Sequence, residues 1–321
     1  MTIPVLTPPT TAELAVPYLT PAGFAAYPTW LDLDNLIPGG VAALQTDELA
    51  EALLSASSWA VGVVDNMPLH GHYVQNEMLR TRAGSGGRVY IQPRHVPVRS
   101  ITALSWGGDP SCMYTDTLPD SSMWVEDGRE VSFRPGGGFQ QFTGPAIQFG
   151  PSLRPQMPVY VTWSYVAGFP NATLSASCVQ GASSVTVTDP TSILPGDVLR
   201  IYDAGDTSSA VGASEALTVA ATYAPAIPTI PPTATSIPLA APTQYAHAAG
   251  IGITGFPRRA LQAVIAYTVA LLMRDDTSAE RPATGFGPAA EGRGGEPHAQ
   301  PSALVAEATG WLLSYAPVMR S

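Results

Sequence analysis

Glycine and proline set the first limit on what this chain can fold into. The sequence has 30 glycines and 32 prolines among 321 residues, so nearly one residue in five interrupts regular structure. Such a composition argues against a long coiled coil or a simple helical bundle. The length is about twice that of a typical domain and leaves room for two compact units. We therefore expect loops, turns and β-structure to dominate.

The charge is negative overall and unevenly spread. The formal net charge is −10, all 15 basic residues are arginines, and residues 1–79 hold eight acids without an arginine. Residues 80–170 hold eight arginines and six acids. Neutralising phosphates needs a cationic footprint, so the chain is a poor candidate for a nucleic-acid clamp. The asymmetry instead suits a contact between the acidic front of one subunit and the arginine-bearing segment of another.

Five arginines follow Glu77 with no acid among them, from Arg80 to Arg99. They are compatible with a subunit contact, a nucleic-acid contact or a solvated hairpin face. We favour the subunit contact because the guanidinium fork pairs well with carboxylates at interfaces. The residues of this stretch that we assign to a subunit interface are Arg80, Arg82 and Arg88.

Helical periodicity occurs in four places. Thr20-Pro21 is a helix-start signal for a short turn, and Thr46 is expected to cap a helix that runs to about Asn66. Another helix begins with Pro257 at its first position and runs to about Arg274, and a last one covers residues 301–315. The helix after Pro257 is apolar nearly all round, which predicts burial by neighbouring subunits as well as by its own domain. Its predicted interface residues are Leu261, Val264, Ile265 and Leu272.

A period of two begins at His70 and predicts β-structure. The first strand is expected to turn at Gly84–Gly87 and return over Arg88–Gln92 as a hairpin. A break in composition at Gly168 is followed by residues 171–253, which are poor in charge and contain short β-branched runs. We interpret them as an inserted β-module. Further strands are predicted at 101–106, 123–126, 130–133, 159–166, 184–188, 197–202, 217–221 and 236–239.

These patterns predict an α+β chain whose helical core carries β-hairpins and an inserted small β-domain. An extended N-terminal arm and a tethered C-terminal helix complete it. The predicted divisions are an arm and short helix over 1–45, a core over 46–170 and 254–275, the inserted β-domain over 171–253, and a linker with a docking helix over 276–321. No run is long enough to span a bilayer and no secretory signal opens the chain, so we expect no membrane partner and synthesis in the cytoplasm.

Catalytic patterns are scarce. The five histidines form no HExxH motif, and His70-Gly71-His72 lacks further metal ligands at motif spacing. The glycine-rich turns match neither the Walker loop nor the dinucleotide fingerprint. We therefore expect no enzyme activity, no metal and no cofactor. The main alternative is a glycan-binding or hydrolytic protein that uses the β-insert, with its stacking and acidic residues at Trp106, Trp124, Trp163, Asp197, Asp203 and Asp206.

Several segments, in their order and spacing, form a recognisable set. No single one is diagnostic, and together they extend over roughly residues 18–275. They are Tyr18–Phe24 with Pro28-Thr29, the helix end Ala56–Ala60, the Arg80/Arg82 hairpin leading to Gln92–Val98, the strand Val161–Asn171, and the insert segments Gly181–Pro190 and Pro195–Asp197.

This set resembles the head-to-tail adaptor (connector) proteins of long-tailed phages that infect actinobacteria. The resemblance implies a structural virion protein at the head–tail junction. Members form a twelve-subunit ring under the portal, extend the DNA channel and offer a platform to the next neck or tail-completion protein. Genomic DNA would pass through the lumen without sequence-specific binding. A C-terminal segment docks on the portal, and in this chain that role would fall to Trp311, Leu312, Leu313 and Tyr315.

Overall fold

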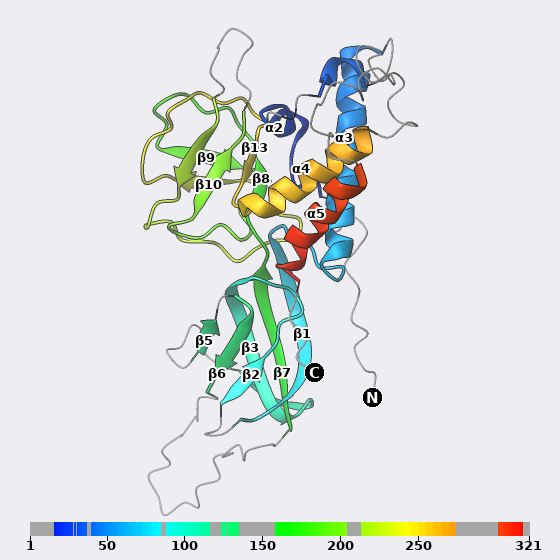
Figure 1. Cartoon of the computed structure of the whole chain (residues 1–321). Helices are drawn as coiled ribbons and strands as arrows, with labels where there is room; N and C mark the ends of the chain where they lie inside the picture. Colours follow the sequence, from blue (N-terminus) through cyan, green and yellow to red (C-terminus); the bar gives the residue numbers. More distant parts are fainter. Residues whose placement is uncertain are drawn as a thin grey trace, which may run out of the picture. The chain divides into compact units, whose positions relative to one another are not determined.

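The computed structural model describes residues 16–27, 29, 31–36, 40–84, 88–115, 123–126, 128–134, 158–203, 213–273 and 301–316. The chain is a mixed α+β protein, as predicted, and it splits into two compact units (Figure 1). Within the described residues, the sheet unit runs from Gly71 to Gly168. The second unit joins the residues up to His70 to those from Phe169 onward. The predicted domain bounds stay a prediction.

The sheet unit is organised around β7 (Pro158–Ala167), an inner strand of a four-stranded antiparallel sheet with the order β1-β7-β3-β4. β7 pairs with β1 (His72–Arg82) on one side and with β3 (Val98–Asp109) on the other, and β3 then pairs with β4 (Cys112–Thr115). Alternating residues of β7 face the core, which explains the period of two in its sequence. Trp163 of β7 lies opposite Glu77 of β1 and Leu104 of β3.

A second, three-stranded sheet in this unit contains the returning strand of the predicted hairpin. β2 (Val89–Ile91) returns antiparallel to the end of β1, where Ala83 bridges to Val89 and Gly84 N donates to Arg88 O at 2.8 Å. The ladder partner of β2 was not predicted: β2 pairs with β6 (Glu130–Phe133), which pairs with β5 (Met123–Glu126). The physical reason is burial, because β2 packs its apolar side chains with those of β6 in one core. That core comprises Ala83, Val89, Ile91, Val98, Leu104, Trp106, Val131, Phe133, Val159, Val161, Trp163, Tyr165 and Ala167.

The second unit begins with short helical segments and a long helix. Thr20 caps α2 (Pro21–Ala25) by accepting a hydrogen bond from Gly23 N, which confirms the predicted helix start. A 3-10 turn, η1, covers Leu33–Asn35. The long helix α3 covers Ala42–Val63 and starts one turn before the predicted cap. Thr46 therefore lies inside the helix, where its hydroxyl donates to Ala42 O.

Two further helices contact α3. α4 (Arg258–Leu272) and α5 (Pro301–Leu313) lie side by side and both contact α3 (Figure 1). Pro257 is the residue before α4, whereas the sequence predicted it as the first residue of the helix. After α3, Asp65 and Asn66 adopt the left-handed region, with φ of 62° and 57°, and end the helical segment. Among the helices of the described chain, none combines the length and hydropathy of a membrane span.

The strands β8 to β13, in the described residues 171–203 and 213–254, form the β-module of the second unit. One sheet has the order β11 (Glu215–Thr218), β10 (Val198–Ile201), β13 (Gly252–Thr254), β8 (Asn171–Thr173). A second sheet pairs β9 (Ser184–Val187) with β12 (Thr235–Pro238). The predicted strands near 184, 197, 217 and 236 are confirmed, whereas β8 and β13 were not predicted. The buried core of this module comprises Leu174, Cys178, Val185, Val187, Ile193, Leu199, Ile201, Leu217, Val219, Tyr223, Ile237, Leu239 and Ile253.

Candidate functional site

A pair of histidines lies at one end of the sheet unit. His72 is the first residue of β1, and His95 lies in the turn between β2 and β3. His72 Nε2 and His95 Nδ1 are 2.9 Å apart, so one ring N–H donates to the other ring. The sequence spacing alone pairs His72 with His70 instead. Within the described residues no group of three His, Cys, Asp or Glu side chains is arranged to hold a metal ion.

The His95 turn is joined to a buried carboxylate through Tyr165. The backbone N–H of His95 donates to Tyr165 Oη at 3.2 Å, and Tyr165 is also hydrogen-bonded to Glu77. Trp163 Nε1 donates to Glu77 Oε2 at 3.1 Å. Because Glu77 is 4% exposed, these donors take the place of water around a carboxylate in the core. The result is a polar cluster, defined here as Glu77, His72, His95, Trp163 and Tyr165.

Burial shifts the pKa values of this cluster. Burial raises the pKa of Glu77 above its ordinary value, although its hydrogen bonds to Tyr165, the Arg94 backbone and Trp163 oppose the shift. Burial, with His72 and Arg94 nearby, lowers the pKa of His95 to about 3. Burial and the Glu77 carboxyl raise the pKa of Tyr165. At neutral pH His95 is therefore an uncharged imidazole.

A second histidine cluster lies in the β-module. His247 Nδ1 is 2.9 Å from Asp203 Oδ2, and His247 Nε2 is 2.8 Å from Glu215 Oε1. The backbone of His247 also exchanges two hydrogen bonds with Cys178. Glu215 Oε2 accepts a further bond from Gln244 N at 2.8 Å. Both ring nitrogens face carboxylates, so neither is directed at a metal or a substrate.

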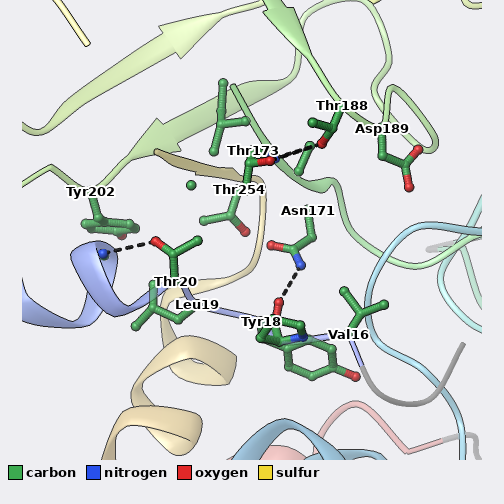
Figure 2. Close-up of a pocket in the computed structure, with 15 residues that line it drawn as sticks. Val16, Tyr18, Leu19, Thr20, Asn171, Thr173, Thr188, Asp189, Tyr202 and Thr254 are labelled. Atoms are coloured by element: carbon green, nitrogen blue, oxygen red, sulfur yellow. Dashed lines mark hydrogen bonds between the residues drawn. The ribbon is translucent and has the colours of Figure 1, made fainter. Parts of the chain in front are cut away.

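A cavity of about 240 Å³ lies within the second unit (Figure 2). The segment Val16–Thr20 forms one wall, and residues of β8, β13 and the Thr188–Asp189 turn form the other. Polar groups in these walls are bonded to protein: Asn171 Nδ2 donates to Pro17 O, and the hydroxyls of Thr173 and Thr188 are 3.2 Å apart. Asp189 Oδ1 accepts from Thr191 N, and burial raises the pKa of Asp189. The arrangement holds the wall together and gathers no nucleophile with a base.

The predicted arginine interface lies on β1 and β2. Arg80 and Arg82 are exposed and two residues apart, so they lie on one face of β1. Arg80 Cζ is 5.8 Å from the centre of the Tyr160 ring, a cation–π distance. Arg88 is half-buried and its Nε has no hydrogen-bond partner. The structure therefore brings two of the three arginines together on an accessible face.

The predicted interface residues of α4 lie inside the chain and not on its surface. Leu261, Val264, Ile265 and Leu272 of α4 are all buried by residues of the same chain. Ile265 and Leu272 belong to a core with residues of α2 and α3, which comprises Leu19, Phe24, Leu36, Leu49, Ala52, Leu53, Ile265 and Leu272. Packing within one subunit thus accounts for their apolar character without a neighbouring chain.

The predicted docking helix is α5, and it packs against its own chain. Leu312 is fully buried, Trp311 and Tyr315 are half-buried, and Leu313 is 56% exposed. Tyr315 meets Phe169 edge-on with ring centres 6.0 Å apart. Of the four predicted residues, Leu313 offers the largest open apolar surface to a partner.

Several residues on which the alternative glycan-binding hypothesis depends are buried or already hydrogen-bonded within the chain. Trp106 and Trp163 are buried in the sheet unit, so neither offers a ring face to a sugar. Asp203 is paired with His247, and Asp197 Oδ2 accepts from Leu194 N. The described residues do not include Asp206 or the side chain of Trp124. They also leave out residues 85–87 of the glycine-rich turn, most of the N-terminal arm and the linker.

In comparisons with known proteins, no family model, no curated protein and no solved structure matches the chain.

Proposed function

We propose that the chain is a head-to-tail adaptor of a long-tailed phage that infects actinobacteria. It would be a structural subunit, without enzyme activity, of a ring of twelve copies under the portal. The ring would extend the DNA channel and join the capsid to the tail. The observation that carries the proposal is the ordered set of segments that resembles this family.

The places of these segments within each unit support the proposal. Tyr18 N donates to Ser57 Oγ at 2.9 Å, which joins the first segment to the end of α3. Gly168 N donates to Pro97 O at 2.9 Å, and His95 N donates to Tyr165 Oη, which joins the turn before β3 to β7. The residues that carry the resemblance thus hold the backbone together, as expected of a structural protein whose recognisable positions maintain a fold.

The chemistry of the polar clusters is consistent with a structural role. Each ring nitrogen of His247 faces a carboxylate, and Glu77 is enclosed by donors from β7. A general base needs a nitrogen or carboxylate directed at a substrate position. In the part of the chain that the structure describes, these clusters direct their hydrogen bonds at other protein groups.

The partners under this proposal are further copies of the chain, the portal, and the next neck or tail-completion protein. The exposed Arg80 and Arg82 are the residues we assign to contacts between copies, because residues 1–79 supply eight acids and no arginine. Leu313, which is 56% exposed on α5, is the residue we assign to the portal contact.

Labelling of phage particles tests the proposal directly. An antibody raised against the purified chain, detected with gold particles in electron microscopy, should mark the junction between head and tail. Production of the phage without this chain should yield filled heads and separate tails. Labelling of the tail tip or capsid surface, or normal joining without the chain, would contradict the proposal.

A further inference from the structure

The long helix α3 is buried on one face and exposed on the other. Leu49, Ala52 and Leu53 on the buried face belong to the core that α3 shares with α2 and α4. The exposed residues recur at intervals of three and four, so they form a stripe along the opposite face of the helix. This stripe, called the α3 stripe below, comprises Leu44, Asp47, Glu51, Ser55, Ser58 and Gly62.

The α3 stripe is acidic in its middle and has no cation of its own. Asp47 and Glu51 are one turn apart, and residues 1–79 contain no arginine or lysine. Within the described residues neither carboxylate forms an ion pair. Leu44, one turn before Asp47, is 47% exposed, and the stripe residues after Glu51 are serine or glycine. A face of this kind can come close to a flat surface that carries positive charge.

The sheet unit has such a surface on β1. β1 is an edge strand of its sheet, and its exposed Arg80 and Arg82 lie on one face. Their partners across the ladder, Tyr160 and Pro158, are uncharged. Among the residues that the structure describes, neither arginine forms an ion pair. The planar guanidinium groups are therefore open to carboxylates of another molecule.

The two pairs of charges have matching spacing. Asp47 and Glu51 are separated by about 6 Å along the helix axis, because each residue of a helix adds 1.5 Å. Arg80 and Arg82 are separated by about 6.6 Å along β1, because each residue of a strand adds about 3.3 Å. Both carboxylates can thus meet both guanidinium groups at once when the helix lies along the strand. A single exposed ion pair contributes little, whereas several held in one register can fix a contact.

The wider charge of the two units has the same polarity. Of the described residues, the sheet unit holds seven arginines and four acids, whereas the second unit holds three arginines and eleven acids. Copies of the chain therefore attract each other where the sheet unit of one approaches the second unit of another. This complementarity favours a second copy of the chain as the partner of the α3 stripe.

We propose that the α3 stripe of one copy binds the Arg80 and Arg82 face of β1 in the next copy. Asp47 and Glu51 pair with the two arginines, and Leu44 is covered at one end of the contact. Because the two faces differ, the contact is heterologous: it repeats from copy to copy and gives a ring if the rotation closes. This inference rests on the proposed adaptor function, which needs a ring, and it identifies the surface that the two arginines bind.

Charge reversal in mixed samples tests this inference. Two variants of the full chain, Arg80→Glu/Arg82→Glu and Asp47→Arg/Glu51→Arg, are compared by native mass spectrometry in the condition in which the unaltered chain assembles. Each variant alone should give at least about tenfold less assembled chain, because like charges then face each other. An equimolar mixture should restore assembly, with equal numbers of the two variants in each ring, because every contact then joins opposite charges. A chain that carries all four substitutions should assemble alone.

A matched control reverses two exposed acids of the same unit that lie outside α3. This variant, Asp34→Arg/Glu307→Arg, should assemble like the unaltered chain. All the substituted side chains are exposed, so the thermal unfolding of each variant should match that of the unaltered chain.

The outcomes separate this inference from the proposed function. If the unaltered chain does not assemble alone or with the portal, the adaptor proposal fails and this inference fails with it. If the unaltered chain assembles but either reversal alone assembles equally well, or the mixture does not, the inference alone is overturned. Rescue in the chain with four substitutions but not in the mixture would also overturn it, because the charges would then pair within one chain.

Discussion

In the sheet unit His95 is buried beside another imidazole, whereas in the β-module His247 is buried between two carboxylates. His95 lies in the turn before β3 and His247 in an isolated bridge with Cys178, and both are less than 9% exposed. Their surroundings give them different chemistry. Burial lowers the pKa of His95 to about 3, so it is neutral and adds no charge to its core. Each ring nitrogen of His247 instead lies within hydrogen-bond distance of a carboxylate.

A buried histidine can thus stabilise a small β-structure in two ways. In the sheet unit, Trp163, Tyr165 and the backbone of Arg94 form hydrogen bonds with a single buried carboxyl group, Glu77. In the β-module, the carboxylates of Glu215 on β11 and of Asp203, just after β10, lie on either side of the His247 ring. Removing a partner should therefore destabilise the β-module more, and acid should act on the sheet unit through His95.

The largest effect should come from Glu215→Ala. Without this carboxylate, one ring nitrogen of the buried His247 loses its acceptor, and the exposed backbone N–H of Gln244 loses one as well. We expect a loss of about 3–5 kcal/mol in the free energy of unfolding, measured by urea denaturation with hydrogen exchange in the β-module. The control is Glu51→Ala, an exposed carboxylate of α3, which should change stability by less than about 0.5 kcal/mol. A similar small loss for both variants would contradict the proposed difference between the two histidine sites.

Acidification should destabilise the sheet unit through His95. The pKa of His95 is lowered in the folded state, so the unfolded chain binds the proton more tightly and stability falls as pH drops from about 6.5 toward 3. Between pH 7 and pH 5 this contribution is about 2 kcal/mol. Hydrogen exchange of β1, β3 and β7 at both pH values measures it. His95→Gln should remove this part of the pH dependence, and an unchanged dependence in His95→Gln would contradict the assignment.

A smaller effect of opposite sign is expected for Glu77. Burial raises the pKa of Glu77, so the folded state binds the proton more tightly than the unfolded state does. Stability therefore falls as the pH rises from the ordinary pKa of a glutamate through the raised pKa of the folded state. Glu77→Gln removes this fall and keeps an acceptor for Trp163 Nε1. We expect a change of about 1 kcal/mol at neutral pH, measured by urea denaturation. A steeper loss of stability with rising pH in Glu77→Gln would show that the carboxyl group is not the cause.

The smallest effect on stability should come from the exposed arginines. The double variant Arg80→Ala/Arg82→Ala should change the free energy of unfolding by less than about 0.5 kcal/mol, because both side chains are exposed. If these arginines join subunits, the same variant should weaken self-association, measured by sedimentation at several concentrations. Arg129→Ala, another exposed arginine of the sheet unit, is the control. Equal association of the two variants would remove Arg80 and Arg82 from the interface.

Local patterns predicted the elements better than their partners. The alternating residues of β7 and the capping pair Thr20-Pro21 act over a few residues, so the sequence was sufficient to place them. β8 and β13 have three residues each, too few to show a period. The partner of β2 is β6, some 40 residues further along, and no local signal favours it over β1.

The polar clusters were not predictable for the same reason. His72 and His95 are 23 residues apart, and His247 is 44 and 32 residues from Asp203 and Glu215. Their contacts depend on strand register and on turns that bring distant segments together. The sequence did indicate that the histidines match no catalytic motif, but it could not show which of them would be paired.

The native mass of the purified full chain tests the central claim most directly. Native mass spectrometry would be performed on the chain alone and after mixing with the portal of the same phage. We predict a species of twelve chains in at least one of these conditions. A chain that stays monomeric in both, at concentrations well above those in the cell, would contradict the claim that it is a ring-forming adaptor.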